Sequence, residues 1–269
     1  MSRPEEKPLL TDSPLTVDPW QQLRSFTRAR IALGRVGSSL PTREVLDFGM
    51  SHAMARDAVH TPLDAEGLCE ALQACSFRAQ LVQSAAPDRP TYLLRPDLGR
   101  KLSPRGIEVL SVPGSPECDV AFIIGDGLSS LAVSKHAVPV LEALRGMMPE
   151  AWRNAPVVVA TQARVALSDQ IGELLHARIV VMLIGERPGL SSPDSLGIYI
   201  TYAPRVGRQD SERNCISNVR PEGLPYAAAA RKMLWLLNEA LRIKLTGVGL
   251  KDESDMVEIA MAAELHGSV

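Results

Sequence analysis

Aromatic side chains are scarce in this 269-residue chain, where Phe, Trp and Tyr together make up 4%. Proteins that bind single-stranded nucleic acid stack the bases on such side chains, so the scarcity disfavours that class. A general field of positive charge is absent too, because 29 Lys and Arg face 31 Asp and Glu and leave a net charge of −2. Together these two absences argue against nucleic acid as a partner.

Metal-ligand spacings and catalytic motifs are missing as well. The four cysteines form no C-x-x-C pair, and the five histidines form no H-x-x-x-H or H-E-x-x-H motif, so we expect neither a zinc site nor a metal-binding residue set. The chain has no G-x-S-x-G, no Walker loop and no supported Ser/His/Asp set. We therefore assign no catalytic residue to this chain.

Long apolar runs are also lacking. None approaches the ~20 residues that a bilayer-spanning helix needs, and the N-terminus carries acids and prolines where a signal peptide is apolar. Disulfides are not expected in a chain that can bury a large core. These features predict a soluble, reduced, cytoplasmic protein that does not associate with membranes.

The N-terminal part of the chain is predicted to be helical. Residues 1–17 are polar and proline-rich and are predicted to form a flexible arm. Asp18 and Pro19 then resemble the cap and first position of a helix that ends near Gly34 or Gly37. A second helix is predicted to begin at Thr42, with one apolar face, and a third to cover residues 65–74. The apolar face of the second helix carries Leu46, Met50 and Met54.

The remainder, residues 81–269, is predicted to alternate strands with helices. Continuous Val/Ile/Leu runs separated by helical stretches are typical of a parallel sheet covered on both faces. The predicted fold class is therefore α/β, a Rossmann-like parallel sheet with a helical N-terminal extension over residues 18–80. The predicted strands are 107–110, 119–124, 157–160, 178–184 and 197–202, and the predicted helices are 128–147, 165–176, a short piece after Pro193, and 226–245.

Small and polar residues follow the predicted strands, at the sheet edge where parallel α/β folds bind ligands. Any one of these loops could simply form a turn, but five on one edge favour a binding crevice. The loops read GDGLSS, TQARV, GERPGL, APR and RNCISN.

Three features of these loops leave alternatives open. GDGLSS resembles a dinucleotide-binding fingerprint, but Ser130 stands where the third glycine belongs. Glu186 follows an apolar strand and could accept hydrogen bonds in the crevice, or it could be solvated or paired with Arg187. Cys215 is by default an inert small residue, because no histidine lies near it in sequence.

Arginine is concentrated in the first predicted helix. Residues 20–43 contain five arginines and no acid, a local charge of +5. On a helix, Arg24, Arg28 and Arg35 would fall within about 40° of one another. Such a row suits bidentate contacts with carboxylates, and it lacks the glutamates that usually mix into a solvated face. We therefore favour a docking surface for an acidic partner over a merely solvated face.

Several segments, from about Asp18 to Asp252, resemble the small (light) subunit of ethanolamine ammonia-lyase. They include DPWQQLRSFTRARIALGRVGSSLPTREVLDFGMSHAMARDAV, DQIGELL, GERPGLSSPDSLGIYITYAPR, RNCISNVRPEGLPY and KLTGVGLKD. The resemblance implies a lyase that converts ethanolamine to acetaldehyde and ammonia by radical chemistry with adenosylcobalamin. It also implies a large-subunit partner that carries the catalytic residues, six large plus six small subunits, and a role in ethanolamine catabolism, in some organisms inside a bacterial microcompartment.

The resemblance also implies cofactor-binding positions. Those that match in this sequence are Val165, Glu186 and Cys215. On this hypothesis Glu186 accepts from amide groups of the corrin periphery, while Val165 and Cys215 supply close apolar and backbone contact. Because the D-x-H-x-x-G motif is absent, we expect base-on cobalamin, with its own dimethylbenzimidazole on cobalt. Two other hypotheses stay open: a nucleotide-dependent oxidoreductase that uses the GDGLSS loop, and a ligand-free scaffold that recruits an acidic partner.

Overall fold

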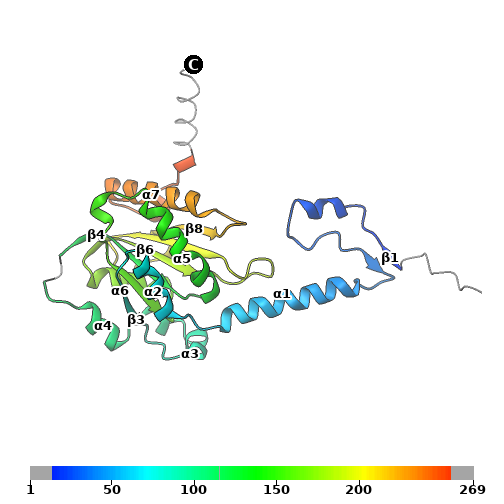
Figure 1. The fold of residues 1–269 in the computed structure, drawn as a ribbon, viewed down its shortest axis with the longest axis horizontal. Coiled ribbons are helices and arrows are strands. Elements are labelled where there is room, and N and C mark those ends of the chain that lie inside the picture. The colour runs from blue at the N-terminus through cyan, green and yellow to red at the C-terminus, as the bar shows by residue number, and fades with distance from the viewer. Residues whose placement is uncertain (1–13, 115, 256–269) are drawn as a thin grey trace, which may run out of the picture. The chain divides into compact units, whose positions relative to one another are not determined.

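The computed structural model describes residues 14–114 and 116–255 (Figure 1). By its internal contacts the chain divides into two compact units. The N-terminal unit contains the residues up to Arg56 together with Gly189–Ser191, and the sheet unit contains Asp57–Pro188 and the residues from Ser192 onward.

A six-stranded mixed sheet forms the centre of the sheet unit, in the order β3-β5-β4-β6-β7-β8. This confirms the predicted α/β class. The pairings among β3, β5, β4 and β6 are parallel, whereas β7 and β8 are antiparallel to their neighbours. The strands are β3 (Ala79–Gln83), β4 (Cys118–Gly125), β5 (Val157–Thr161), β6 (Ala177–Gly185), β7 (Leu196–Tyr202) and β8 (Asn214–Val219).

The antiparallel return of β7 follows from its short connection. Only residues 186–195 separate β6 from β7, and they contain no helix, so the short helix predicted after Pro193 is wrong. A parallel crossover needs a dozen or more residues, usually with a helix, whereas an antiparallel strand needs only a turn or loop. The parallel part of the sheet therefore ends at β6.

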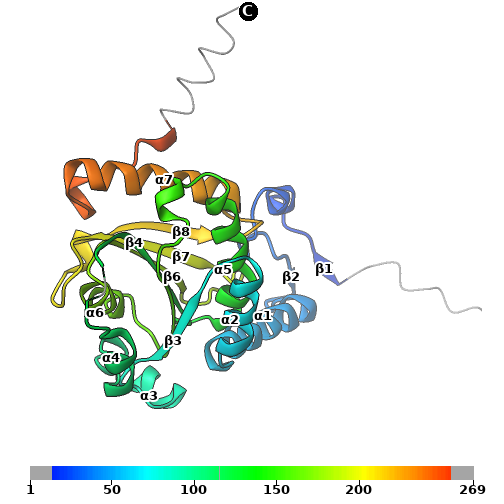
Figure 2. The ribbon, with the colours of Figure 1, turned by 60° about the vertical axis from the view of Figure 1, so that its left-hand side comes forward.

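Helices cover both faces of this sheet, as Figure 2 shows. Successive strand residues point to opposite faces, so Phe122 packs in one apolar cluster with helices α2, α5 and α7, while Ile123 packs in another with α4 and α6. Both side chains are fully buried. The helices of this unit are α2 (Ala65–Ala74), α3 (Arg89–Leu94), α4 (Pro104–Leu110), α5 (Ser130–Arg145), α6 (Leu167–Leu174) and α7 (Tyr226–Ile243).

The predicted strand at 107–110 is wrong, because these residues form the end of α4. Ser103 caps this helix by accepting a hydrogen bond from Gly106 N at 3.1 Å, and Pro104 occupies the first helical turn. Cap and proline are both strong helix-start signals. They decide the structure of a short apolar run whose periodicity alone is ambiguous.

In the N-terminal unit, the predicted helix over residues 18–34 is wrong. A short 3-10 helix at Gln21–Ser25 is followed by irregular backbone and β2 (Arg35–Val36), which pairs with β1 (Leu15–Thr16). Positive φ angles at Ala32 (50°) and Gly34 (73°) are incompatible with a continuing helix. No residue in 14–56 is buried, in this segment or in the part of the unit that is helical.

The second predicted helix is confirmed as α1 (Thr42–His60). Its apolar residues are exposed in the isolated chain: Leu46 is 67% exposed, Met50 64% and Met54 50%. Among the residues that the structure describes, no helix has both the length and the apolar character needed to cross a membrane.

Candidate functional site

A cleft of about 430 Å³ lies at the carboxyl edge of the parallel strands. The loops that follow β4, β5 and β6 contribute to its wall, which is the usual position of ligand sites in open α/β sheets. Among its lining residues are Tyr92, Gly127, Arg164, Val165, Glu186 and Tyr199.

Two glycines let the loops after β4 and β6 lie against each other. Gly127 has a φ of +58°, and a Cβ on it would overlap the carbonyl oxygen of Gly185. A Cβ on Gly185 would in turn overlap the carbonyl oxygen of Ser129. Packing between the two loops thus accounts for Gly127, the second glycine of GDGLSS, without a dinucleotide, which weakens the oxidoreductase hypothesis.

Asp126, in the GDGLSS loop, fixes the loop after β5. Its carboxylate accepts hydrogen bonds from Gln162 N at 2.9 Å and Ala163 N at 2.8 Å, and it pairs with Arg89 at 3.3 Å. Burial raises the pKa of Asp126, while the two backbone N–H groups and Arg89 act in the opposite direction. The carboxylate also holds Gln162 at an uncommon φ of +55°. Asp126 is therefore a structural residue that shapes the cleft wall.

Tyr92 provides a rigid aromatic wall. Its hydroxyl donates to Ala163 O at 3.0 Å, and burial raises its pKa to about 12, so the phenol is neutral. The guanidinium carbons of Arg89 and Arg164 lie 4.7 and 4.3 Å from the ring centroid. These cation–π contacts position Arg164 at the cleft.

The structure places Glu186 and Val165 together in this cleft, as their positions after β6 and β5 predict. Glu186 Oε2 accepts a hydrogen bond from Ser195 Oγ and another from Asn218 N at 3.3 Å. Arg187 is exposed and forms no ion pair with Glu186 among the described residues. Glu186 is half-buried and fixed on one oxygen, which leaves the other available as an acceptor.

Cys215 does not line the cleft and reaches it only through Tyr199. The RNCISN segment is not a loop but contributes β8, and Cys215 lies opposite Tyr199 in the β7–β8 register. Removal of water from the sulfur raises the pKa of the Cys215 thiol, and Glu186 adds to this, while the hydrogen bond with Tyr199 lowers it. Burial raises the pKa of Tyr199 as well. Both groups are therefore protonated at neutral pH.

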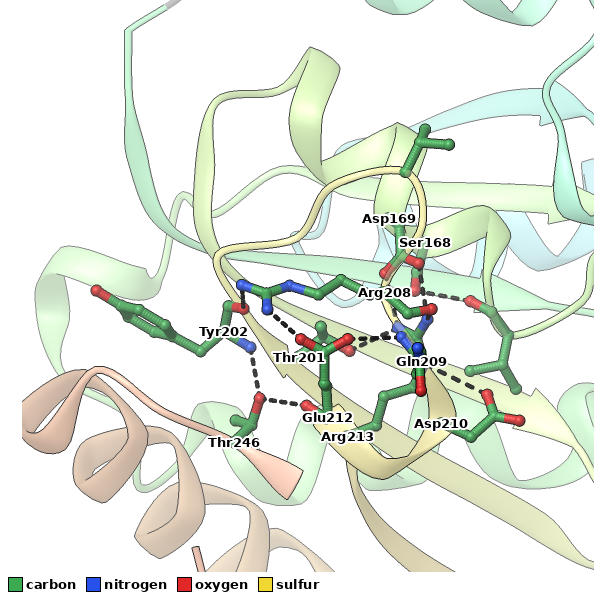
Figure 3. Close-up of polar contacts among 12 residues, drawn as sticks. Ser168, Asp169, Thr201, Tyr202, Arg208, Gln209, Asp210, Glu212, Arg213 and Thr246 are labelled. Atoms are coloured by element: carbon green, nitrogen blue, oxygen red, sulfur yellow. Dashed lines mark hydrogen bonds and ion pairs between the residues drawn. The ribbon is translucent and has the colours of Figure 1, made fainter. Parts of the chain in front are cut away.

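The APR loop after Tyr202 lies at the opposite edge of the sheet, because β7 runs antiparallel. Its neighbourhood holds a polar cluster (Figure 3). Arg213 donates to both carboxylate oxygens of Asp169, at 2.6 and 2.7 Å, and to Thr201 Oγ1 at 2.9 Å. The side chain of Arg213 is 1% exposed and that of Asp169 is 2% exposed. This cluster joins α6 to β7 and β8 and is structural, so the predicted fourth loop is not part of the ligand edge.

The predicted row of arginines is corrected along with its helix. Arg24 lies in the last turn of the 3-10 helix and pairs with Glu44 at 2.9 Å. Arg28 lies in the irregular segment that follows, and Arg35 begins β2. Acids from α1 thus neutralise part of the basic segment, since Arg43 also pairs with Asp47 at 3.8 Å.

Three residues of the cleft were missed by sequence reasoning: Tyr92, Arg164 and Tyr199. Arg164 stands directly before Val165 in the TQARV loop, and this adjacency was the available signal. The two tyrosines reach the cleft from α3 and β7, through contacts that no local pattern reveals.

The groups that line the cleft are suited to binding a polar ligand. Within residues 14–114 and 116–255, no group of three or more His, Cys, Asp or Glu side chains is placed to hold a metal ion. The cleft offers one carboxylate acceptor, two guanidinium donors and two neutral tyrosines. These groups fit a large polar ligand with amide or anionic groups.

Fold and cleft define an α/β protein with a polar cleft at the carboxyl edge of its parallel strands. The sequence profile of the ethanolamine ammonia-lyase light chain (EutC) family matches residues 17–251, and the chain belongs to this family.

Relatives agree over nearly the whole chain. The ethanolamine ammonia-lyase small subunit of Azotobacter vinelandii is 55% identical over 260 residues, 95% of this chain and 96% of the relative. The small subunit of Ralstonia nicotianae is 53% identical over 253 residues, 91% of this chain and 93% of the relative. That of Xanthomonas campestris is 55% identical over 243 residues, 88% of this chain and 89% of the relative.

Proposed function

We propose that this chain is the small subunit of an adenosylcobalamin-dependent ethanolamine ammonia-lyase and that its cleft forms part of the cobalamin site. The observation that carries the proposal is the meeting of Glu186 and Val165, from separate loops, in one cleft of a chain of this family. When bound, the cofactor supplies radicals by Co–C homolysis for the conversion of ethanolamine to acetaldehyde and ammonia.

The size of the cleft supports a shared site. A volume of about 430 Å³ lies in the range of pockets for drug-sized ligands. A corrinoid is much larger than such a ligand, so this cleft can cover only part of it. The rest must be enclosed by another chain, and a large subunit fits that role.

The roles of the cleft residues follow from their chemistry. Glu186 accepts hydrogen bonds from peripheral amide N–H groups, with Ser195 fixing the carboxylate. Val165 supplies an apolar contact. Cys215 acts at one remove, because its protonated thiol orients Tyr199 at the cleft. Glu186 and Val165 bind the ligand, Cys215 positions Tyr199, and none of the three moves a proton.

The N-terminal region, residues 18–80, is proposed to dock on the large subunit, with six large and six small subunits in the complex. Its exposed apolar residues support this, since large exposed apolar patches mark interaction sites. Arg28, from irregular backbone, and Arg35, from β2, are proposed to contact acids of the large subunit. The complex is placed in the cytoplasm, free or inside a bacterial microcompartment.

Co-expression with a candidate large subunit, followed by an ethanolamine assay with and without adenosylcobalamin, tests the proposed reaction. Activity that depends on both subunits and on the cofactor is expected, and turnover by this chain alone with a nicotinamide or flavin would contradict it.

The variant Glu186→Ala tests the proposed cofactor site. It is expected to weaken cofactor affinity about tenfold, the loss of one charge-assisted hydrogen bond, while assembly by size-exclusion chromatography stays intact.

A further inference from the structure

Arg164 lines the cleft, and most hydrogen-bond donors of its guanidinium have no acceptor among the described residues. Its guanidinium makes one side-chain hydrogen bond among the described residues, from Nη2 to Tyr92 O at 3.3 Å. Its Nε is buried without an acceptor. A guanidinium has five N–H donors, so most of its donor capacity is unpaired.

The Arg164 side chain is nevertheless held in place. Its backbone N–H donates to Gly99 O at 2.8 Å, and its Cγ lies where a Cβ on Gly99 would come within 2.9 Å. The contact with the Tyr92 ring fixes the charged end. A side chain that is positioned but unpaired is suited to recognise a ligand group at little cost in conformational entropy.

The cleft also carries a surplus of positive charge. Arg187 lines it as well, and among the residues that the structure describes neither Arg164 nor Arg187 has a carboxylate within 4.0 Å. Glu186 is the single carboxylate in the lining. A neutral amide is recognised by hydrogen-bond donors and acceptors without a net charge. An anionic oxygen is recognised best by a positively charged group that donates two parallel hydrogen bonds, as a guanidinium does.

We propose that Arg164, assisted by Arg187, binds the phosphodiester of the ligand. This inference rests on the proposed function, because base-on cobalamin carries one phosphodiester in the nucleotide loop that links the corrin ring to dimethylbenzimidazole. The phosphodiester is a monoanion at neutral pH. Arg164 thus binds the nucleotide-bearing part of the cofactor, while Glu186 accepts hydrogen bonds from its amide groups.

The test compares three corrinoids on the assembled complex of both subunits, with affinity measured by equilibrium dialysis. Adenosylcobalamin contains the phosphodiester, adenosylcobinamide lacks the whole nucleotide, and adenosylcobinamide phosphate keeps a phosphate but lacks the base. Arg164→Gln is expected to weaken adenosylcobalamin and adenosylcobinamide phosphate about tenfold and to leave adenosylcobinamide unchanged. Arg164→Lys, which keeps the charge but not the fork, is expected to fall between.

Arg105→Gln, an exposed arginine on α4 outside the cleft, is the matched control and is expected to change none of the three affinities. An equal loss for adenosylcobinamide would place the Arg164 contact on the corrin periphery, and an unchanged affinity for adenosylcobalamin would exclude the contact. If the wild-type complex binds the cofactor, either result overturns this inference and leaves the proposed function intact. Failure of the wild-type complex to bind any of the three corrinoids would overturn the proposed function and this inference with it.

Discussion

The two units of this chain treat their apolar residues in opposite ways. In the sheet unit, strands β4, β5 and β6 are almost wholly buried between two layers of helices. In residues 14–56 no residue is buried, and Trp20 and Phe26 are 67% and 85% exposed. Burial of apolar surface is the main driving force of folding. The sheet unit therefore has a core of its own, whereas the N-terminal unit, taken by itself, leaves its apolar side chains exposed.

The largest expected effect is in the sheet unit, at the buried pair Asp169–Arg213. Asp169→Ala leaves the Arg213 cation buried without its carboxylate, which is expected to cost about 3–5 kcal/mol in the free energy of unfolding. Urea unfolding monitored by circular dichroism measures this cost. Asp97→Ala breaks an exposed pair with Arg95 and is expected to change the free energy of unfolding far less, because water and salt screen exposed ion pairs. An equal loss of unfolding free energy in the two variants would contradict the claim that the buried pair stabilises the sheet unit more than an exposed pair does.

The next prediction concerns the exposed face of α1. Leu46, Met50 and Met54 are replaced together with Gln, whose helix propensity is similar to that of Leu and Met. This triple variant is expected to change the unfolding free energy of the isolated chain by less than about 1 kcal/mol. The same variant is expected to weaken association with the large subunit at least about tenfold. Analytical ultracentrifugation measures the association.

The buried Leu141→Ala in α5 is the control for this comparison. It is expected to cost about 2–5 kcal/mol in stability and to leave the association constant of the folded protein unchanged. If the triple Gln variant unfolded as readily as Leu141→Ala, α1 would belong to the core of the isolated chain and the contrast between the two units would fail.

A smaller effect is expected from pH. Burial lowers the pKa of His136, while Asp194 raises it and Lys135 lowers it. The unfolded histidine therefore binds a proton more readily than the folded one. Stability is full above the ordinary pKa of 6.5 and is lost as the pH falls from 6.5 toward the folded pKa.

Urea unfolding, measured between pH 7.5 and 5, gives the slope of the unfolding free energy against pH. One proton limits this slope to about 1.4 kcal/mol per pH unit. His136→Gln is expected to reduce the slope, and His52→Gln, in the exposed N-terminal unit, serves as the matched control. A slope that is the same in His136→Gln and in the wild type would contradict the assignment.

The smallest expected effect is at Cys215. Because its thiol pKa is raised, little thiolate forms near neutral pH, and the thiolate is the reactive species. Iodoacetamide is expected to alkylate Cys215 at pH 7.5 more slowly in the folded chain than in the urea-unfolded chain, although the residue is exposed. Mass spectrometry of the peptide gives both rates. Faster alkylation in the folded chain would indicate an activated cysteine.

Sequence reasoning succeeded where a local pattern and burial agree. The continuous apolar runs of β4, β5 and β6 predicted the central strands, and the apolar spacing of Leu46, Met50 and Met54 predicted α1. The edge strands β3 and β8 were missed because they mix polar and apolar residues, as in AQLVQ and NCISNV.

The predicted N-terminal helix was wrong because the backbone takes positive φ angles at Ala32 and Gly34. The local signal at Asp18 and Pro19 closes only a turn, in which Asp18 accepts a hydrogen bond from Trp20 N at 2.8 Å. The cleft was half predicted. Val165 and Glu186 follow strand ends, but Tyr92 and the Asp126 contacts that shape the wall join segments far apart in sequence.

The most direct test of the proposed division between the two units is the adenosylcobalamin affinity of the assembled complex, measured by equilibrium dialysis at saturating large subunit. The cleft variant Glu186→Ala and the triple Gln variant of α1 are compared with the wild type. We predict that Glu186→Ala weakens cofactor binding about tenfold, whereas the triple variant, once driven into the complex, binds as the wild type does. The opposite result, with normal affinity in Glu186→Ala and a loss confined to the α1 variant, would contradict it.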